Sequence, residues 1–327
     1  MTISRREFVT AAGAAALVAA VPPARSQQLE AVNYLLPAPQ SLPTFAPWVL
    51  AQHRGYYARE GLQVTFQTGR GGVDVAKQLG AGNAPIGGGL GDTPIIARAQ
   101  GVPVKAVGLM GGRALHHLYL MEGVGINSLR DLKGKTMTVI SYQDTSFYVL
   151  LGILATVGLT KNDVDIQAAG PVGVWQQAVA GKSVGFVGPI DFGLAARTAG
   201  GKVRYLASDQ YVKSMAQAIL ASDEMIQKRP ELVRKLVRAT LQGLADILKD
   251  PMGSVTAYIA AAPAFAGREA YLQEAFRQYI EYTYSGSKVL GAMDPERMAE
   301  VQNYYVQQGI VPKAVPVNEL YTNQFIQ

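Results

Sequence analysis

The chain has 327 residues, of which 49% are hydrophobic and 17% are charged. This length predicts two domains, and the composition is typical of a folded globular protein rather than a disordered one. A net charge of +6 without a basic run interleaved with aromatic residues argues against nucleic acid as a partner, and the absence of cysteine excludes thiol nucleophiles, iron–sulfur clusters and thiolate zinc sites.

The first 26 residues are predicted to be an export signal. Arg5 and Arg6 precede an apolar run at 11–21, and small residues offer a cleavage position near Ser26. The run is too short to span a bilayer. The arginine pair resembles a twin-arginine signal, with an ordinary secretory signal as the alternative. We therefore expect a periplasmic protein whose mature chain carries 27 basic and 23 acidic residues, a net charge of +4.

Strand and helix patterns alternate in the first part of the mature chain. The expected elements are a strand at 31–36, a helix at 46–60, a strand at 62–68 and a helix at 73–79. A glycine loop at 69–72 joins the last two. This order predicts a parallel α/β unit with helical crossovers.

The stretch 81–107 is expected to hold a strand that ends near Gly87, a glycine loop through Gly91, a helix and a second strand. Asp92 or Thr93 is predicted to cap that helix. The N-terminus of the helix would direct unpaired N–H groups and a positive dipole end into the crevice beyond the strand. We therefore expect one ligand-facing edge of the sheet here, although the glycines could equally serve only a tight turn.

A second, smaller α/β unit is predicted at 126–208. Its expected strands are 136–140, 164–168, 184–187 and 203–207. A further apolar strand at 118–121 is expected in the crossing between the two units. The C-terminal third is expected to be helical, at 230–249, 268–282 and 294–308.

Several motifs in this order resemble one known family. They are RGYYAREGLQV at 54–64, QLGAGNAPIGGG at 78–89, AQGVPVKAV at 99–107, DLKGK at 131–135 and RPELV at 229–233. Together they are similar to the substrate-binding proteins of ABC transporters, in the branch for nitrate, sulfonates, taurine and thiamine-pyrimidine precursors. The resemblance covers nearly all of the mature chain.

This resemblance implies a type II periplasmic-binding-protein fold, in which two α/β lobes joined by a two-segment hinge close on a small ligand. Lobe 1 would comprise residues 27–125 and 209–327, with the C-terminal helices packed back on it, and lobe 2 residues 126–208. The resemblance also implies a monomer that delivers a small molecule to an inner-membrane ABC permease with its ATPase. The alternatives are a ligand-sensing partner of a membrane receptor and a thiamine-pyrimidine-synthase-like enzyme.

An enzyme is not expected. Thiamine-pyrimidine synthases of this branch carry a cysteine-rich iron motif, and related desulfinases use a cysteine nucleophile, whereas this chain has no cysteine. The sequence also lacks a G-x-S-x-G elbow and an H-E-x-x-H metal motif. We therefore expect neither a catalytic residue, nor a cofactor, nor a metal ion.

Ligands of open α/β sheets lie beyond the carboxyl ends of the strands. The loops expected at those ends supply the candidate ligand-binding residues, which are Gln40, Arg70, Gly71, Gly91, Asp92, Thr93, His116, Tyr142, Thr145, Ser146, Pro189 and Asp191.

Two ligand chemistries remain open at this point. An anion would use a bidentate contact from Arg70 together with the helix N-termini. A pyrimidine would stack on Tyr142 and use an acidic acceptor, Asp92 or Asp144. Adjacent histidines on a strand point to opposite faces, so at most one of His116 and the next residue faces the cleft, and we expect it to be His116.

Overall fold

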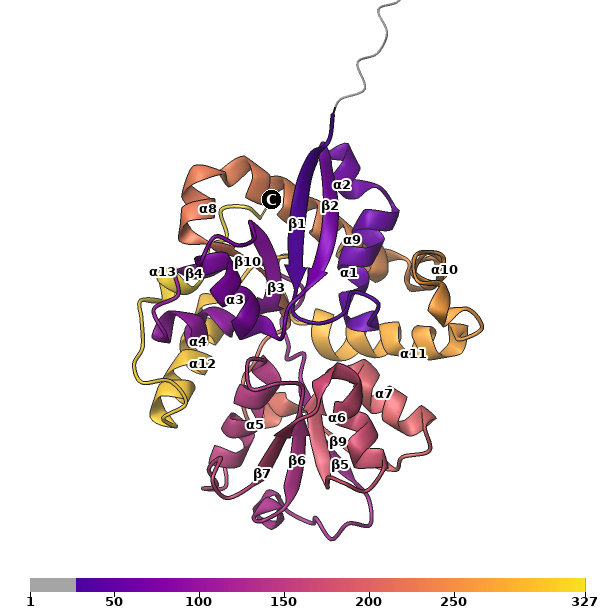
Figure 1. Ribbon diagram of the computed structural model, residues 1–327, viewed down its shortest axis with the longest axis vertical. Helices are drawn as coiled ribbons and strands as arrows, with labels where there is room; N and C mark the ends of the chain where they lie inside the picture. The colour runs from indigo at the N-terminus through magenta and orange to yellow at the C-terminus, as the bar shows by residue number, and fades with distance from the viewer. Residues whose placement is uncertain (1–27, 327) are drawn as a thin grey trace, which may run out of the picture.

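The computed structural model describes residues 28–326, which form two α/β lobes stacked along the long axis of the molecule (Figure 1). The predicted export signal lies outside the described residues. The sheet of the first lobe has the order β2-β1-β3-β10-β4, with β1 (Glu30–Leu36), β2 (Leu62–Thr68), β3 (Ile86–Leu90), β4 (Val104–Leu109) and β10 (Gln217–Ser222). The sheet of the second lobe has the order β7-β6-β8-β5-β9, with β5 (His117–Met121), β6 (Thr136–Val139), β7 (Asp165–Ala168), β8 (Gly185–Gly188) and β9 (Val203–Leu206).

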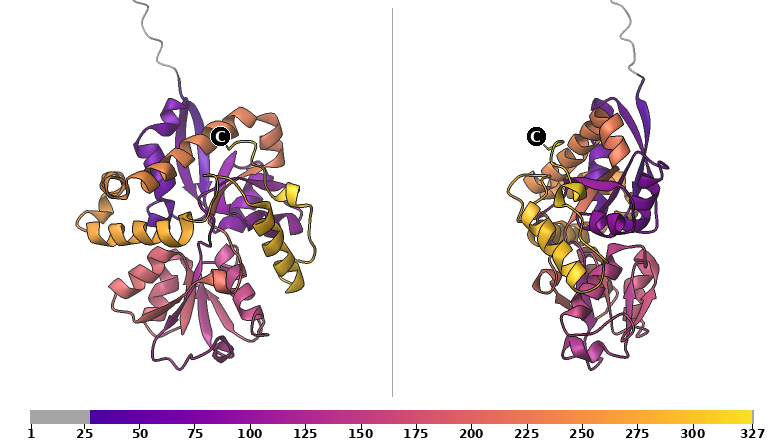
Figure 2. Two further views of the ribbon diagram at one scale, coloured as in Figure 1. Left: turned by 180° about the vertical axis from the view of Figure 1, so that it is seen from behind. Right: turned by 90° about the vertical axis from the view of Figure 1, so that its left-hand side faces the viewer.

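Helices cover both sheets (Figures 1 and 2). Those of the first lobe and the C-terminal part are α1 (Ala46–His53), α2 (Tyr56–Arg59), α3 (Gly72–Gly80), α4 (Thr93–Ala99), α8 (Asp223–Lys228), α9 (Pro230–Lys249), α10 (Pro251–Ala261), α11 (Glu269–Tyr279), α12 (Pro295–Gln307) and α13 (Val317–Leu320). Those of the second lobe are α5 (Thr145–Ala155), α6 (Gly170–Val179) and α7 (Ile190–Thr198). No helix within residues 28–326 is both long and apolar enough to cross a membrane.

Both sheets are mixed rather than parallel. In the first lobe β10 runs antiparallel to its neighbours β3 and β4, and in the second lobe β5 runs antiparallel to β8 and β9. Residues 118–121 therefore belong to the second sheet, not to the crossing, and the second lobe begins near residue 117 rather than at 126. The strand β10 was not predicted from the sequence, because all of its residues are buried and it shows no alternation of polar and apolar positions.

The glycines at 87–89 form strand β3, whereas a loop was expected there. A Cβ atom at Gly89 would lie 2.6 Å from Leu220 Cδ1 on the neighbouring strand, and one at Gly87 would lie 2.9 Å from the carbonyl oxygen of Leu35. The missing side chains therefore allow neighbouring strands and helix α3 to pack closely on β3. The run serves close packing of the sheet.

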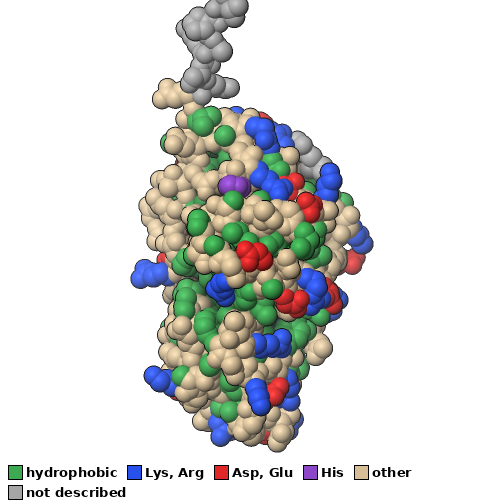
Figure 3. All heavy atoms as spheres, turned by 90° about the vertical axis from the view of Figure 1, so that its right-hand side faces the viewer, with side chains coloured by type: hydrophobic (Ala, Val, Ile, Leu, Met, Phe, Trp, Pro, Cys, Tyr) green, Lys and Arg blue, Asp and Glu red, His purple; other side chains and the backbone are tan. Residues whose placement is uncertain are grey.

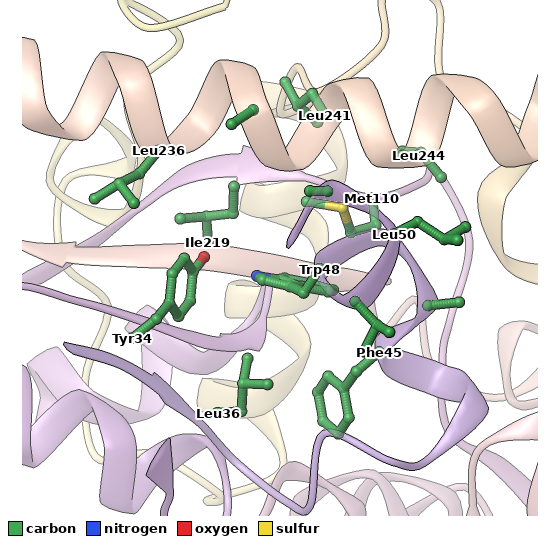
Figure 4. Close-up of a cluster of buried hydrophobic side chains, with 14 of the residues drawn as sticks. Tyr34, Leu36, Phe45, Trp48, Leu50, Met110, Ile219, Leu236, Leu241 and Leu244 are labelled. Atoms are coloured by element: carbon green, nitrogen blue, oxygen red, sulfur yellow. The ribbon is translucent and has the colours of Figure 1, made fainter. Parts of the chain in front are cut away.

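The core of the first lobe lies between its sheet and helices α1 and α9 (Figure 4). Trp48 from α1 is fully buried and meets the ring of Tyr34 edge-on, with centroids 6.5 Å apart. Leu236 and Leu244 of α9 cover the same layer. Helix α9 has the predicted bounds, with Pro230 at its first position. Burial of its apolar face therefore holds the C-terminal third on the first lobe.

Gly243 is the contact point between α9 and α1, since a Cβ atom there would collide with the carbonyl oxygen of Pro47 and lie 3.0 Å from Ala51 N. We expect Gly243→Ala to lower the free energy of unfolding by about 1–3 kcal/mol, because the two helices must move apart. Gly173→Ala in α6 is the matched control, since its nearest atom is 3.6 Å away and alanine favours the helix. Urea denaturation measures both. Equal stabilities of the two variants would contradict the packing argument.

Candidate ligand-binding cleft

A cavity lies between the two lobes, at the carboxyl ends of β1, β3, β6 and β8. Its lining residues are Pro37, Ala38, Leu42, Thr44, Phe45, Gly72, Gly89, Leu90, Leu115, His116, Ile140, Asp144, Thr145, Pro189, Phe192 and Gln217. The cavity volume is about 30 Å³, well below the roughly 150 Å³ of an apolar cavity that binds benzene. The structure therefore represents lobes closed on each other, and a larger solute must enter through an opened form.

Direct contact of two loops closes the cleft on one side. Val73 N donates to Gln143 O at 3.0 Å, and Ser141 Oγ donates to Arg70 O at 2.7 Å. Between these bonds Gly71 adopts φ +113°, and a Cβ atom there would lie 2.6 Å from Gln143 O and 2.7 Å from Asp144 Cα. We call this contact of residues 69–73 with 141–145 the interlobe seam. Only glycine fits at its centre.

Three helix N-termini begin at the cleft, and each carries its own acidic residue. Asp74 in the first turn of α3 accepts from Arg70 N at 2.9 Å. Asp144, the N-cap of α5, accepts from Ser146 N at 2.8 Å. Asp191 lies in the first turn of α7. These carboxyl groups offset the positive ends of the helix dipoles, which leaves less field for an anionic ligand.

His116 lines the cavity and is 3% exposed. Its Nδ1 atom has no hydrogen-bond partner among residues 28–326 and lies 3.9 Å from Asp144 Oδ1, beyond hydrogen-bonding distance. Burial lowers the pKa of His116, so the imidazole is neutral at pH 7. His117 instead packs its ring against Tyr205, and burial lowers its pKa to about 3. The pair thus divides between the cleft and the interior of the second lobe.

Gln217, the first residue of β10, also lines the cavity and is 2% exposed. Its Nε2 atom donates to Thr44 O at 2.7 Å and to Thr44 Oγ1 at 2.8 Å, whereas Oε1 has no partner in the described part of the chain. Sequence reasoning missed Gln217 and Thr44 because the strand that positions Gln217 was itself not recognised. A polar residue directly before a short apolar run was the only available signal.

Three of the predicted residues line the cavity: His116, Thr145 and Pro189. Gln40 does not, and borders an outer surface depression beside His53. The side chain of Arg70 is exposed and outside the cavity, because its backbone forms part of the interlobe seam.

The Tyr142 side chain is 50% exposed, and its hydroxyl donates to Ile166 O at 2.8 Å. Its ring lies edge-on against Phe147 rather than over the cavity. The expected stacking platform is therefore absent at this position. The nearby Ser146 is buried, and its Oγ accepts from Ile140 N at 3.2 Å, so it supports the loop and not a ligand.

Gly91, Asp92 and Thr93 are not among the residues that line the cavity. Asp92 is fully buried and accepts from Tyr305 OH at 2.8 Å and from Ser214 Oγ at 3.1 Å, and its burial raises its pKa. It makes no capping bond to its own helix. Thr93 Oγ1 instead accepts from Leu90 N at 2.9 Å. Asp92 thereby joins the first lobe to the returning hinge segment and to α12.

Asp191 connects the second lobe to α11 of the C-terminal part. Tyr279 OH donates to Asp191 Oδ1 at 2.5 Å, and Tyr271 OH donates to the Asp191 carbonyl oxygen at 3.1 Å. Burial raises the pKa of Asp191 to about 6. The side chain thus binds the lobes together beside the cavity wall formed by Pro189 and Phe192.

Among residues 28–326, the cavity lining contains no permanently charged basic side chain. No Lys or Arg is among the residues that line the cavity. On the face shown in Figure 3, basic and acidic side chains are interspersed and neither forms a continuous patch. Within residues 28–326, no group of three or more His, Asp or Glu side chains is placed to hold a metal ion.

Comparison with known proteins identifies the family. A family model described as NMT1/THI5 like matches residues 42–254. The chain belongs to this family. It is 29% identical over 294 residues to a riboflavin-binding protein of Chloroflexus aurantiacus, covering 86% of this chain and 82% of that protein. It is 25% identical to the 4-amino-5-hydroxymethyl-2-methylpyrimidine phosphate synthase of Schizosaccharomyces pombe, covering 84% and 80%.

Solved structures confirm the fold. A protein of Bordetella bronchiseptica aligns with a TM-score of 0.77 at 17% identity, covering 91% of this chain and 96% of that one. The alkanesulfonate-binding protein of Xanthomonas axonopodis pv. citri aligns with a TM-score of 0.71 at 18% identity, covering 90% and 98%. The predicted periplasmic-binding-protein fold is therefore correct. The sequence relatives include both a binding protein and synthases, so the family alone does not decide between binding and catalysis.

We expect Gly71→Ala to hinder closure, because the added Cβ would meet the backbone of residues 143 and 144 and strain a glycine conformation. Ligand affinity should fall more than tenfold, and small-angle scattering should show less compaction on binding than in the wild type. Gly82→Ala is the matched control, since Gly82 also has positive φ, at +78°, but has open space around it. Wild-type compaction in Gly71→Ala would show that the seam does not govern closure.

The raised pKa of Asp191 predicts a pH dependence of stability. Folding favours the protonated form of Asp191. The contribution of this group to the free energy of unfolding is therefore fully present below pH 4 and is lost as the pH rises through about 6. Asparagine does not ionise, so Asp191→Asn should not lose stability in this pH range. At pH 7.5 its free energy of unfolding should be higher than that of the wild type by up to about 3 kcal/mol. Urea denaturation at pH 4.5 and 7.5 measures the difference. A parallel pH profile for both proteins would refute the raised pKa.

Proposed function

We propose that this protein is the extracytoplasmic solute-binding component of an ABC importer, and that it captures a neutral nitrogen heterocycle by closing its two lobes. Membership of a family with a riboflavin-binding relative and the fold shared with an alkanesulfonate-binding protein support solute binding. The proposal includes an inner-membrane permease with its ATPase as the partner, and a periplasmic location.

The composition of the cleft carries the choice of ligand. Within residues 28–326, the polar residues that line it include a neutral His116, Asp144 and Gln217 but no Lys or Arg, and Gln217 Oε1 has no hydrogen-bond partner. A buried anion needs charge-assisted donors, and the helix N-termini here are already offset by Asp144 and Asp191. A ligand with N–H donors suits this lining better than a sulfonate or nitrate does.

The apolar part of the lining suits a flat ring. Phe45 and Leu42 from the first lobe and Phe192 from the second border the same cavity. Ligand sites commonly combine such apolar walls with a few directed polar atoms. A planar heterocycle would bury its faces against these side chains and present its edge to Gln217 and His116.

Closure supplies the mechanism. The cavity of about 30 Å³ cannot admit such a ring, so binding requires an open form. The seam and the Tyr279–Asp191 hydrogen bond stabilise the closed form without a ligand. A ligand that contacts both lobes shifts the population from the open form toward a closed form whose cleft is widened to hold it. The binding free energy is thereby coupled to lobe movement.

Binding without catalysis is part of the proposal. Several relatives are named as pyrimidine phosphate synthases. The cysteine-rich motif that synthases of this branch carry has no counterpart here, because the chain contains no cysteine.

The relatives suggest the compounds to test first. We expect riboflavin or 4-amino-5-hydroxymethyl-2-methylpyrimidine to raise the melting temperature, and an alkanesulfonate or nitrate to leave it unchanged. At a hundred times the dissociation constant, binding should stabilise the protein by about 2.7 kcal/mol, or roughly 5 °C. Arg70→Ala should bind the heterocycle like the wild type, because Arg70 lies outside the cavity. Stabilisation by the anions alone, lost in Arg70→Ala, would reverse the proposal.

A further inference from the structure

The backbone of Gln217 is fixed by hydrogen bonds beside the cleft. It opens strand β10 opposite Leu90, the last residue of β3, so it lies at the carboxyl end of that central strand. Its carbonyl oxygen accepts from Met110 N at 2.8 Å, which ties it to the crossing segment. The side chain therefore starts from a position that both the sheet and the hinge define.

The orientation of the Gln217 amide follows from its partner. Thr44 O is a carbonyl oxygen and can only accept, so the amide nitrogen and not the oxygen must face it. The Thr44 hydroxyl accepts from the same nitrogen at 2.8 Å. Both N–H groups of the amide are thereby used, and Oε1 is turned away from Thr44. This oxygen is buried and has no donor within residues 28–326.

The opposite wall offers a complementary arrangement. His116 presents an unpartnered Nδ1, and its carbonyl oxygen accepts from Ser208 Oγ at 2.5 Å, which anchors the residue to the returning segment. Buried polar atoms in native proteins are nearly always paired. An unpartnered acceptor and an unpartnered imidazole nitrogen on two residues that line one cavity therefore point to polar atoms of a ligand.

We propose that Gln217, held by Thr44, is the specificity-determining residue of the cleft and accepts a hydrogen bond from a ring or amino N–H of the ligand. The inference rests on the proposed function, and it narrows the ligand to heterocycles with an N–H on the buried edge. A ring whose buried edge carries only acceptors or alkyl groups would leave Oε1 without a partner and is selected against.

The test compares two ligands that differ in one donor. Riboflavin carries an imide N–H at N3, and 3-methylriboflavin does not. Wild-type protein should bind the methylated compound at least tenfold more weakly by isothermal titration calorimetry. If the aminopyrimidine is the ligand that binds, its 4-dimethylamino analogue takes the same place. A wild-type protein that binds both members of a pair equally well would overturn the inference while leaving solute binding intact.

Two variants separate the effect of the Gln217 hydrogen-bond acceptor from the effect of the space that its side chain fills. Gln217→Met keeps the length of the side chain but removes the acceptor. In this variant the methylated ligand should bind at most threefold more weakly than the unmethylated one, and we call this factor the methylation penalty. Thr44→Val is the matched control, because the Thr44 carbonyl still orients the amide, and the penalty should persist. A methylation penalty of tenfold or more in Gln217→Met would show that another group accepts the hydrogen bond from the ligand N–H.

One independent readout does not depend on the folding of a variant. In wild-type protein labelled with nitrogen-15, the side-chain amide resonance of Gln217 should shift with riboflavin and shift less with the methylated analogue. Equal shifts would count against the inference. If no heterocycle binds the wild-type protein, the proposed ligand class and this inference fail together.

Discussion

The interlobe seam is the constraint on which the cleft depends. A backbone hydrogen bond from Val73 to Gln143 and a hydroxyl bond from Ser141 to Arg70 hold two loops so close that Gly71 leaves no room for a side chain. These bonds join residues of different lobes, so they form only in the closed form. They turn the Arg70 backbone toward the seam and leave its side chain in solvent, which removes the cation from the site.

The electrostatics of the site follow from the same closure. Bringing the N-termini of α3, α5 and α7 together would collect three positive dipole ends, and an acidic residue accompanies each. The remaining open groups, Gln217 Oε1 and His116 Nδ1, are neutral. The cleft can therefore distinguish ligands by the direction of hydrogen bonds more readily than by charge. Asp191 accepts a hydrogen bond from Tyr279 across the lobes, and its raised pKa makes the stability of the closed form depend on pH.

Elements with strong local signals were predicted well. Strand β2 and helix α9 have the expected bounds. The alternation of polar and apolar residues in β2, and the helical spacing of apolar residues after Pro230 in α9, are patterns of neighbouring residues and can be recognised in the sequence. Strand β10 was not recognised, because its uniformly buried positions give no periodic pattern. Strand β3 was expected to end near Gly87 but continues to Leu90, because its glycines were interpreted as a loop. In the site, His116, Thr145 and Pro189 were placed at the ends of strands, and the structure brings them to one cavity.

The sequence by itself determined the two-lobe α/β class, the order of most elements and the family, because these follow from local periodicity and from motifs of adjacent residues. Only the tertiary structure decided which side chains meet. Gln217 and Thr44 are far apart in the chain, and Tyr142 and Asp92 find partners outside the cavity. The direction of a side chain at the end of a strand depends on the packing of distant segments, and no local pattern records that.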